Sequence, residues 1–396
     1  MSDVQRPTIF IVAGEASGDQ HGAMLAQALL ERAEVSLAGV GQQRMRQAGV
    51  ELLFDSTGWS AIGVMEALRR VPKLLLRARQ MIRWLSQHPP DLVVLVDFGA
   101  FNVRLGHQLK KKQDVPILYY FPPRSWSRSA RGFESLARIA DRVATPFPWS
   151  AELLRASGID ATWVGHPVVD RISPPDDRGP VRAKLGLDPH APVVGILPGS
   201  RPAEIGLIAP LSLGAAKIVR RALPDAQFVI SVAPTIKPKA LEAQVRRAGL
   251  GGVRLAPGTS DIVRAADLAI SCCGTATLEA TAAGCPMVVV YRGTALMRLE
   301  YLLRPPKLEH VAMPNIIAER RVVPELLDRE ATPAAVAEAA LSLLGDPDRL
   351  AQTRRELLEV RGTLGPPEVS GRVAEIALEM TGIRHQTSDI GPRTNG

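Results

Sequence analysis

A glycine turn in the second half of the chain has the residues to bind an anionic ligand. Gly274, Thr275 and Ala276 follow the apolar run from Leu268 to Ile270 and open a stretch rich in helix formers. A helix N-terminus presents unpaired N–H groups and a positive dipole end, so we predict that a diphosphate binds here. Glu279 follows one turn later, where its carboxylate can accept the hydroxyls of a ribose. For the glycine alone, an ordinary strand-to-helix turn is the competing interpretation.

A second turn of the same kind precedes it in the chain. Gly199-Ser200-Arg201 follows a strand predicted from Val193 to Leu197 and leads into a helix. Its backbone N–H groups and the guanidinium of Arg201 could meet a phosphate. Together the two turns predict that the second half of the chain holds a nucleoside diphosphate.

A carboxylate in the first half is placed to act on a substrate. Asp97 ends the run Asp91 to Asp97, whose apolar interior is typical of a central parallel strand covered on both faces. Open α/β sheets bind ligands at the carboxyl ends of their strands. Helix capping is the competing role, but the next helix is expected to begin several residues later. Glu15 lies in a comparable turn after the strand from Thr8 to Ala13, and the glycine spacing there does not match the dinucleotide fingerprint.

Metal and cofactor signatures are missing from the sequence. The 7 histidines never occur in pairs at ligand spacing, and the 3 cysteines form no Cys-x-x-Cys. We therefore expect no metal and no cofactor, and reduced thiols. A diphosphate leaving group would then be stabilised by Arg201 and helix-end amides.

Composition bounds the class of protein. A chain of 396 residues with 46% hydrophobic and 22% charged residues indicates a globular protein of two domains. The net charge of +8 favours anionic partners, while an aromatic content of 4% argues against nucleic acid. Phosphorylated small molecules or an anionic lipid surface fit better. The N-terminus lacks the pattern of a signal peptide, so we expect a cytoplasmic protein.

Strands and helices alternate along both halves. This pattern predicts an α/β protein with two doubly wound, parallel-sheet, Rossmann-like domains facing across a cleft. We expect an N-terminal domain over 1–172, completed by helices within 365–382, and a second domain over 193–364. Between them, 173–192 is rich in proline and is interpreted as a linker. The polar tail, 383–396, is expected to be disordered.

One predicted helix is strongly basic. From about Val71 to Ser86 it carries an apolar stripe at helical spacing, expected to face the core, with basic residues elsewhere. The stripe is Val71, Leu75, Ala78, Ile82 and Leu85. A solvated basic face is one interpretation of this pattern. The other is a helix that lies on a membrane surface, with surplus apolar side chains outside the stripe beneath its basic ones; these are Leu74, Leu76, Met81 and Trp84. The segment 296–303 is a second candidate for a membrane-facing helix, and core packing is its competing interpretation.

A set of motifs in a fixed order carries a family resemblance. The sequence resembles the lipid-A-disaccharide synthase family over about 15–327. The matching motifs are Gly14-Glu15-Ala16-Ser17-Gly18-Asp19, Gly165-His166-Pro167, Leu197-Pro198-Gly199-Ser200-Arg201 with Glu204, Gly274-Thr275-Ala276-Thr277-Leu278-Glu279, Pro286-Met287-Val288-Val289 with Tyr291, and Pro314-Asn315 with Pro324-Glu325-Leu326-Leu327.

The resemblance implies a GT-B fold and an inverting transfer from UDP-2,3-diacylglucosamine to 2,3-diacylglucosamine 1-phosphate, at the inner-membrane surface. It implies that Asp97 is the catalytic base and that Glu15, the acidic residue of the first turn, is a second catalytic residue. It also implies that Arg201 contacts the diphosphate and Glu279 the ribose, and that Asn315 lies near the nucleotide. On the acceptor side we expect contacts from Ser17, Gly18, Asp19, Glu66, Asn102 and Arg124. The partners implied are a UDP-sugar, a glycolipid and the membrane, and a homodimer is left open.

Departures from the family pattern keep alternatives open. Ala100 replaces a second acid, the loop 122–128 differs, and Cys273 replaces a serine. Two of these changes fall on the acceptor side. A UDP-hexosamine transferase acting on another lipid acceptor, a UDP-sugar 2-epimerase and a catalytically inactive homologue are therefore the competing functions.

Overall fold

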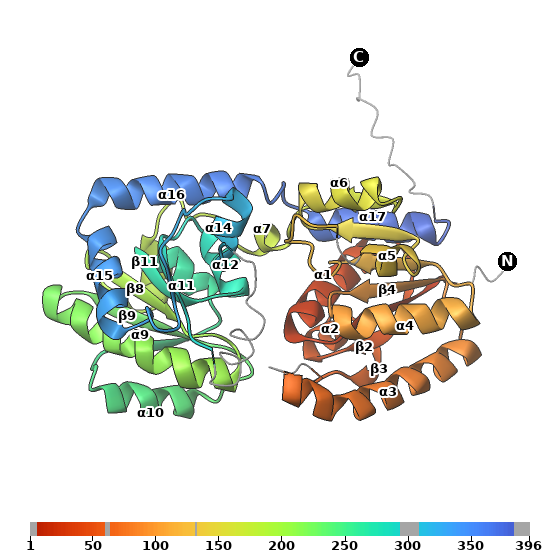
Figure 1. The fold of residues 1–396 in the computed structure, drawn as a ribbon, viewed down its shortest axis with the longest axis horizontal. Helices are drawn as coiled ribbons and strands as arrows, with labels where there is room; N and C mark the ends of the chain where they lie inside the picture. Colours follow the sequence, from red (N-terminus) through yellow and green to blue (C-terminus); the bar gives the residue numbers. More distant parts are fainter. Residues whose placement is uncertain (1–5, 60–63, 131–132, 294–308, 384–396) are drawn as a thin grey trace, which may run out of the picture. The chain divides into compact units, whose positions relative to one another are not determined.

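The computed structural model describes residues 6–59, 64–130, 133–293 and 309–383, without the side chains of 64–70. The chain forms two compact units (Figure 1). Unit 1 contains residues up to Pro167 and those from Pro367 onward, and unit 2 contains Val168–Pro366. The expected disordered tail lies outside the described residues, apart from Ile383.

Among the described residues, unit 1 has a parallel seven-stranded sheet in the order β3-β2-β1-β4-β5-β6-β7. The central strands are buried on both faces, as their continuous apolar sequences predict. The strands are β1 (Thr8–Ala13), β2 (Ser36–Gly41), β3 (Glu51–Asp55), β4 (Leu92–Val96), β5 (Ile117–Tyr120), β6 (Arg142–Thr145) and β7 (Ala161–Trp163). Its helices are α1 (Ala16–Arg32), α2 (Gln43–Gln47), α3 (Val64–Gln87), α4 (Gly99–Lys112), α5 (Phe133–Ala137), α6 (Pro148–Ala156) and α17 (Val369–Met380).

Unit 2 repeats the plan with a six-stranded parallel sheet, as far as the chain is described, in the order β10-β9-β8-β11-β12-β13. Its strands are β8 (Val193–Leu197), β9 (Gln227–Val232), β10 (Arg254–Pro257), β11 (Leu268–Cys272), β12 (Met287–Tyr291) and β13 (Glu325–Leu327). Its helices are α7 (Val168–Arg171), α8 (Gly179–Lys184), α9 (Pro202–Ala222), α10 (Pro238–Ala248), α11 (Ser260–Ala265), α12 (Thr275–Ala282), α14 (Met313–Ala318), α15 (Pro333–Leu344) and α16 (Pro347–Gly362).

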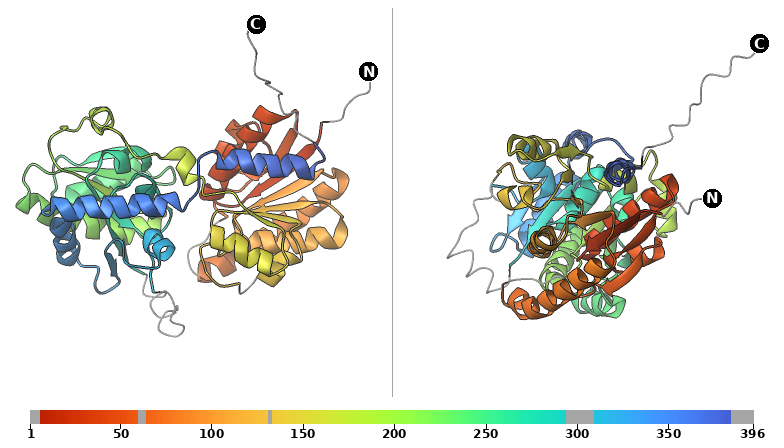
Figure 2. Two further views of the ribbon diagram at one scale, coloured as in Figure 1. Left: turned by 90° about the horizontal axis from the view of Figure 1, so that it is seen from above. Right: turned by 90° about the vertical axis from the view of Figure 1, so that its right-hand side faces the viewer.

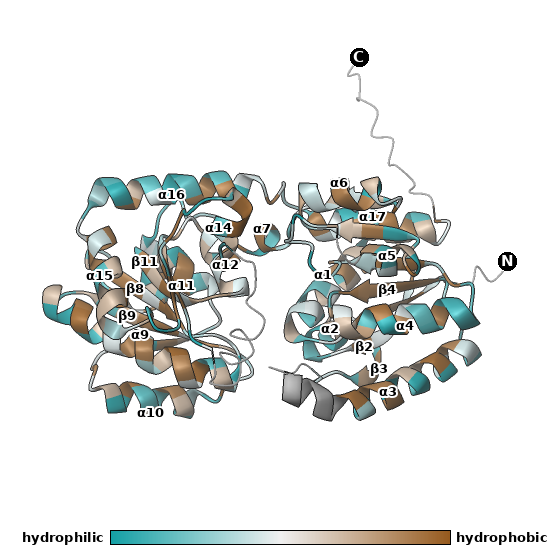
Figure 3. Cartoon of the chain, in the orientation of Figure 1, coloured by the Kyte–Doolittle hydropathy of each residue, from teal (hydrophilic) through white to brown (hydrophobic). Residues whose placement is uncertain are grey.

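Each unit has its own hydrophobic core between sheet and helices. Hydropathy colouring shows hydrophobic residues concentrated in the strands of both sheets, whereas α16 is largely hydrophilic (Figure 3). By length and composition α9 could cross a membrane. Half of its most apolar stretch is buried, however, and α9 packs against α15 and α10 within the core of unit 2.

The boundary between the units differs in detail from the expected one. The chain passes from unit 1 to unit 2 at Pro167 and returns at Pro367. The proline-rich segment 173–192, expected as a linker, belongs to unit 2 and contains α8. Arg182 of α8 is buried and donates a hydrogen bond from Nη2 to Asp267 Oδ2 at 2.8 Å, which attaches the segment to β11.

The C-terminal helix returns to the first unit. α17 packs against α1, as the left view of Figure 2 shows. Val373 and Ala377 are fully buried, and the guanidinium of Arg372 donates to the carbonyl oxygen of Val164 at 2.8 and 3.0 Å. Unit 1 is therefore made of two segments that are far apart in the sequence.

Candidate active site

The strand order reverses beside β1 in unit 1 and beside β8 in unit 2, and the predicted site residues gather at these two points. Ligands of open α/β sheets bind at such switch points, outside the carboxyl ends of the strands. β1 pairs with β4, with Ala13 opposite Val96. Glu15 and Asp97 therefore emerge at the same edge of the first sheet. β8 pairs with β11, with Leu197 opposite Ser271, so the turns at 199–201 and 274–276 share one edge of the second.

Asp97 has an unusual backbone. Asp97 and Phe98 have φ values of 49° and 47°, both in the left-handed region. Such conformations cost about 1–3 kcal/mol each and occur where surrounding contacts impose them. Here Asn102 Nδ2 donates to the carbonyl oxygens of Val96 and Asp97 at 3.1 and 2.9 Å, and Tyr119 donates its hydroxyl to Asp97 O at 2.9 Å. The turn that presents the Asp97 carboxylate is thus held from two sides.

The pKa of Asp97 is raised from 3.8 to about 6. Burial is the largest cause, the negative charge of Glu15 adds to it, and a backbone hydrogen bond from Phe98 opposes it. A carboxylate with this pKa is mostly ionised at pH 7, yet it is a stronger base than an exposed aspartate. The two predicted acids therefore act on each other, as a catalytic pair would.

Asp97 and Glu15 line an apolar pocket of about 320 Å³ within unit 1. Its walls come from Trp59, α3 and α4, and include Val71, Leu74, Leu75 and Ala78 on one side and Phe101 and Leu105 on the other. Arg104 and Gln108 add polar groups. The pocket can accept a hydrocarbon group beside the carboxylate pair.

Two residues expected on the acceptor side have structural roles instead. Asp19 is 3% exposed, and its carboxylate accepts hydrogen bonds from the amides of Gln42, Arg44 and Met45 at 2.6, 3.1 and 3.2 Å. It caps α2 and has little capacity left for a ligand. Asn102 is fully buried, and its side-chain amide donates to the backbone of Asp97, so it holds the Asp97 turn.

The remaining acceptor-side predictions have mixed outcomes. Gly18 is buried where α1 crosses β1 and β4, and a Cβ there would touch Val96 O at 3.6 Å. Ser17 is half-buried, and Arg124 is exposed in a turn with a φ of 62°. The side chain of Glu66 lies outside the described residues.

The turn before α12 is open in the way an anion site requires. Gly274 has a φ of 116°, and no atom of the described residues lies within 4 Å of where its Cβ would be. Thr275 is exposed and Ala276 half-buried, and α12 receives no side-chain cap among the described residues. Its first amides therefore face free space and can receive a phosphate.

The turn before α9 differs from this expectation. The amides of Ser200 and Arg201, expected to meet a phosphate, donate to Glu204 Oε2 at 3.0 and 3.2 Å. Arg201 Nη1 also donates to Glu204 Oε1 at 2.9 Å, and Gly199, with a φ of 107°, passes close to the same carboxylate. In this structure Glu204 occupies these anion-binding groups, which corrects the predicted role of the two amides. The side chain of Arg201 is 44% exposed.

Glu279 and Asn315 are both buried in unit 2, at 7% and 0% exposure. Glu279 lies on α12, one turn after Thr275, as predicted. Asn315 uses its whole amide internally, since Nδ2 donates to Val323 O and Glu325 Oε1, and Oδ1 accepts from the amides of Val322 and Val323. Direct contact of Asn315 with a nucleotide is therefore not supported, and its role is to hold the segment before β13.

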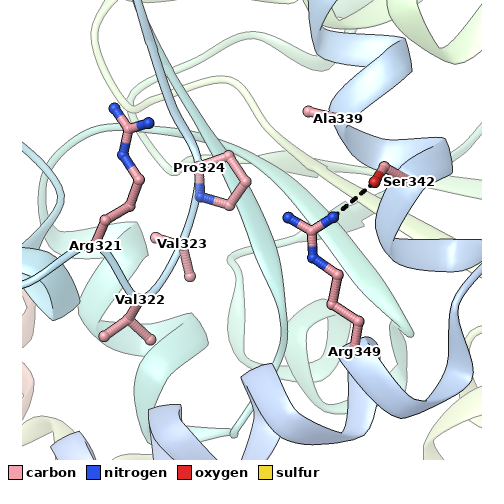
Figure 4. A pocket seen from close by; sticks show the side chains of 7 residues that line it. All are labelled: Arg321, Val322, Val323, Pro324, Ala339, Ser342 and Arg349. Atoms are coloured by element: carbon pink, nitrogen blue, oxygen red, sulfur yellow. Dashed lines mark hydrogen bonds between the residues drawn. The ribbon is translucent and has the colours of Figure 1, made fainter.

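A further pocket in unit 2 adjoins the start of β13 (Figure 4). It also measures about 320 Å³, and its lining residues are Arg321, Val322, Val323, Pro324, Ala339, Ser342 and Arg349. Arg349 donates to Ser342 Oγ at 2.8 Å. Because this pocket adjoins the start of β13, it is at the opposite edge of the sheet from the carboxyl ends of the strands.

Metal-binding clusters of three or more His, Cys, Asp or Glu side chains are absent from the part of the chain that is described. Cys272 and Cys273 are neighbours beside the α12 turn. The hydrogen bond between the two thiols lowers the pKa of Cys273 and raises that of Cys272.

Several residues of these sites were not singled out from the sequence. Tyr119 supports the Asp97 turn, and Trp59 and Arg104 line the pocket. Thr259 donates its hydroxyl to Glu279, and Arg171 pairs with the same carboxylate. Thr259 directly precedes α11, and a threonine at that position indicates a helix cap, not a contact with a distant carboxylate.

The fold and the two half-sites define the class of protein. Two Rossmann-like units, one with paired carboxylates and one with open helix-end amides, are typical of GT-B glycosyltransferases and of enzymes that share their architecture. Solved structures agree on the fold. S. aureus MnaA with UDP has a TM-score of 0.66 at 15% identity, covering 97% of this chain and 100% of that one. The calicheamicin glycosyltransferase CalG4 has a TM-score of 0.58 at 16% identity, covering 98% and 100%.

Sequence comparisons identify the family. The model of the family described as Lipid-A-disaccharide synthetase matches residues 9–377 of this chain. The lipid-A-disaccharide synthase of Geobacter metallireducens is 36% identical over 383 residues, covering 96% of this chain and 99% of that protein. That of Anaeromyxobacter dehalogenans is 39% identical over 374 residues, covering 93% and 96%. The chain belongs to the lipid-A-disaccharide synthetase family and is a hexosyltransferase. The epimerase and the transferase with another acceptor are not favoured.

Proposed function

We propose that this chain transfers 2,3-diacylglucosamine from UDP to 2,3-diacylglucosamine 1-phosphate, giving lipid A disaccharide 1-phosphate and UDP. Membership in the family carries this assignment. The carboxylate pair beside an apolar pocket supports a sugar acceptor that bears acyl chains. S. aureus MnaA, which has a similar fold, was solved together with UDP, and this supports a UDP-sugar as the donor.

Asp97 is the base in this proposal. Its carboxylate takes the proton from the 6-hydroxyl of the acceptor, and the oxygen attacks the anomeric carbon of the donor with inversion. Burial raises the pKa of Asp97 most, and the negative charge of Glu15 raises it further, to about 6. Asn102 and Tyr119 hold the backbone of Asp97 and so direct its side chain.

The diphosphate leaves from unit 2. As the bond from the anomeric carbon to the diphosphate oxygen breaks, negative charge develops on that oxygen. The amides of Thr275 and Ala276 and the guanidinium of Arg201 stabilise this charge. Binding of the diphosphate draws Arg201 partly away from Glu204, to which its guanidinium donates a hydrogen bond.

The apolar pocket holds an acyl chain of the acceptor. Burying each methylene of such a chain contributes about 0.8 kcal/mol, so even part of one chain orients the sugar next to Asp97. Such a substrate resides in a bilayer. We therefore place the chain at the cytoplasmic surface of the inner membrane, attached peripherally, with α3 facing the lipid.

The decisive experiment is an activity assay with both diacyl substrates. Purified protein should release UDP and form the disaccharide, and Asp97→Ala should lower the rate by roughly two decades or more. Release of no more UDP by the wild type than by this variant would contradict the assignment.

A pocket-filling variant tests the acceptor side. Ala78→Trp places an indole in the pocket and should raise the KM for the acceptor, without changing equilibrium binding of UDP. Gln87→Trp adds the same side chain at an exposed position of α3 outside the pocket and serves as the control. An unchanged acceptor KM in Ala78→Trp would argue against this location of the acyl chain.

A further inference from the structure

Two residues of unit 2 hold the carboxylate of Glu279, one at each oxygen. Arg171 Nη2 donates to Oε1 at 2.5 Å, and the hydroxyl of Thr259 donates to Oε2. The side chains of Arg171 and Glu279 are 20% and 10% exposed. A carboxylate this poorly solvated needs such partners to remain ionised.

Three separate segments meet at this carboxylate. Arg171 ends α7, Thr259 precedes α11, and α7 and α11 both pack against α12, which carries Glu279. Thr259 occupies the N-cap position of α11, yet its side chain does not cap that helix. A threonine at this position ordinarily stabilises the helix by capping its first amides. The hydroxyl of Thr259 is used to orient Glu279 instead.

The hydrogen-bonding positions that remain on the Glu279 carboxylate match the two hydroxyls of a diol. A carboxylate has roughly four acceptor positions, two on each oxygen. Arg171 and Thr259 take one on each oxygen, so each oxygen keeps one. A ribose offers two adjacent hydroxyls as donors, and Glu279 lies one turn along the same helix from the Gly274 turn, where the diphosphate is expected.

We propose that Arg171 and Thr259 are positioning residues that fix Glu279 as a two-oxygen acceptor for the ribose 2′- and 3′-hydroxyls. The inference rests on the proposed function, because it takes a uridine nucleotide as the ligand. Neither residue contacts the nucleotide. Their effect is on selectivity for the diol, which a merely structural ion pair would not alter.

The test is calorimetric titration of the full-length protein with UDP, 2′-deoxy-UDP and 3′-deoxy-UDP. A hydrogen bond to a charged group contributes about 1.5–3 kcal/mol, so the wild type should prefer UDP over each deoxy analogue roughly tenfold or more. Arg171→Met and Thr259→Val should reduce this preference to about threefold or less, because the carboxylate is no longer fixed. Thr259→Ser keeps the hydroxyl and should retain the preference.

Arg178→Met is the matched control. Arg178 makes a comparable ion pair elsewhere in unit 2, to Asp267 Oδ1 at 2.8 Å, and Asp267 keeps Arg182 when Arg178 is replaced. This variant should retain the full preference for UDP. If Arg171→Met is too unstable to titrate, Thr259→Val, which only removes a hydroxyl, still decides the question.

Three results would overturn the inference. Equal losses of affinity for UDP and for both analogues in the variants would show that Arg171 and Thr259 only stabilise the fold. A wild type that binds UDP without preference for the diol would overturn it and leave the transferase assignment standing. A wild type that binds no UDP would overturn both.

Discussion

Asp97 has a left-handed backbone and a poorly solvated carboxylate. Both features are energetically unfavourable in the folded protein, and both belong to the carboxylate that we propose as the base. Asn102 and Tyr119 stabilise the turn through carbonyl oxygens, without neutralising the carboxylate. Their hydrogen bonds therefore preserve its basicity. The pH dependence of activity and of stability should both report this arrangement.

The rate should depend on the ionisation of Asp97. Because the base must be deprotonated, kcat/KM should fall as the pH drops through about 6, the raised pKa of Asp97. Glu15→Gln removes one cause of the raised pKa, so the acidic limb should move to lower pH. It should stay above 3.8, since burial, the larger cause, remains. A wild-type limb near pH 4, or one that Glu15→Gln leaves unmoved, would contradict this role.

The stability of the fold should decrease as the pH rises, whereas the activity should increase. A carboxyl group whose pKa is higher in the folded state stabilises the fold below its unfolded pKa, and this contribution is lost as the pH rises through the folded pKa. Above about pH 6 the Asp97 charge thus costs up to about 3 kcal/mol. Asp97→Asn removes the charge and tolerates the left-handed backbone. Chemical denaturation should show this inactive variant to be more stable than the wild type at pH 8 and equal to it near pH 4.

Residue roles were predictable where the position in the fold decides them. Asp97 and Gly274 follow apolar strands, so their placement at the edge of a sheet could be read from the sequence. Asp19 and Asn315 could not be assigned in this way, because their partners are backbone amides of other segments. Polar side chains that cap distant turns look the same in a sequence as side chains that contact a ligand.

At the scale of the element, α3 has one side buried in the core of unit 1 and another side that is exposed. Met81, Ile82 and Leu85 are buried in the core of unit 1, whereas Leu75 and Leu76 are 41% and 55% exposed. The expected core stripe was wrong at Leu75, and Met81, which was placed outside the stripe, belongs to the core. Arg77 lies over the ring of Phe54, which uses part of the basic face within the unit.

The exposed leucines of α3 predict membrane binding. Leu75→Ser combined with Leu76→Ser should weaken sedimentation with vesicles that contain anionic phospholipid, by roughly tenfold or more, since a buried leucine contributes about 1.5–3 kcal/mol. Leu358→Ser changes an exposed leucine of α16 and is the control. Binding should also weaken as salt rises, because the basic side chains are screened. Equal binding by the double variant and the control would refute the role of α3.

Periodicity located α3 but not its orientation. Helical spacing predicts a stripe wherever apolar residues are frequent, and α3 has more of them than one stripe needs. Which ones face the core depends on the neighbouring strands and on Pro72 within the helix. The other expected membrane segment, 296–303, lies outside the described residues.

At the scale of the whole molecule, the chain forms two units that each have their own hydrophobic core. Because α17 belongs to unit 1 alone, removing it should change the stability of unit 1 and not that of unit 2. Truncation after Pro366 removes α17 from unit 1, including the buried Val373, Ile376 and Leu378, and should cost unit 1 several kcal/mol. Unit 2 loses nothing, since it is the continuous segment Val168–Pro366. Calorimetry should show a lost or strongly lowered transition for unit 1 and an unchanged one for unit 2.

Truncation after Ile383 is the matched control, because it removes only residues beyond α17. A shortened chain ending at Pro366 that keeps both transitions would contradict the account. UDP titration of the same chain provides a second readout, since the predicted donor residues all lie in unit 2.

The architecture was the most predictable level. Alternating apolar runs and helical stretches indicate doubly wound sheets whatever the residue details, and the strand orders follow that plan. The exact boundary between the two units was not predictable. The proline-rich composition of 173–192 suggests a linker, but the contact between Arg182 and Asp267 holds α8 in unit 2. Long-range hydrogen bonds of this kind leave no local pattern in a sequence.

The return of α17 to unit 1 also bears on how the chain is made. A ribosome adds about 5–20 residues per second, and unit 1 lacks its last helix until all of unit 2 has been synthesised. The surface of α1 that receives α17 therefore stays uncovered for tens of seconds after the first 167 residues have emerged. Unit 2 can complete its fold earlier, so the order of folding should be the reverse of the order of translation.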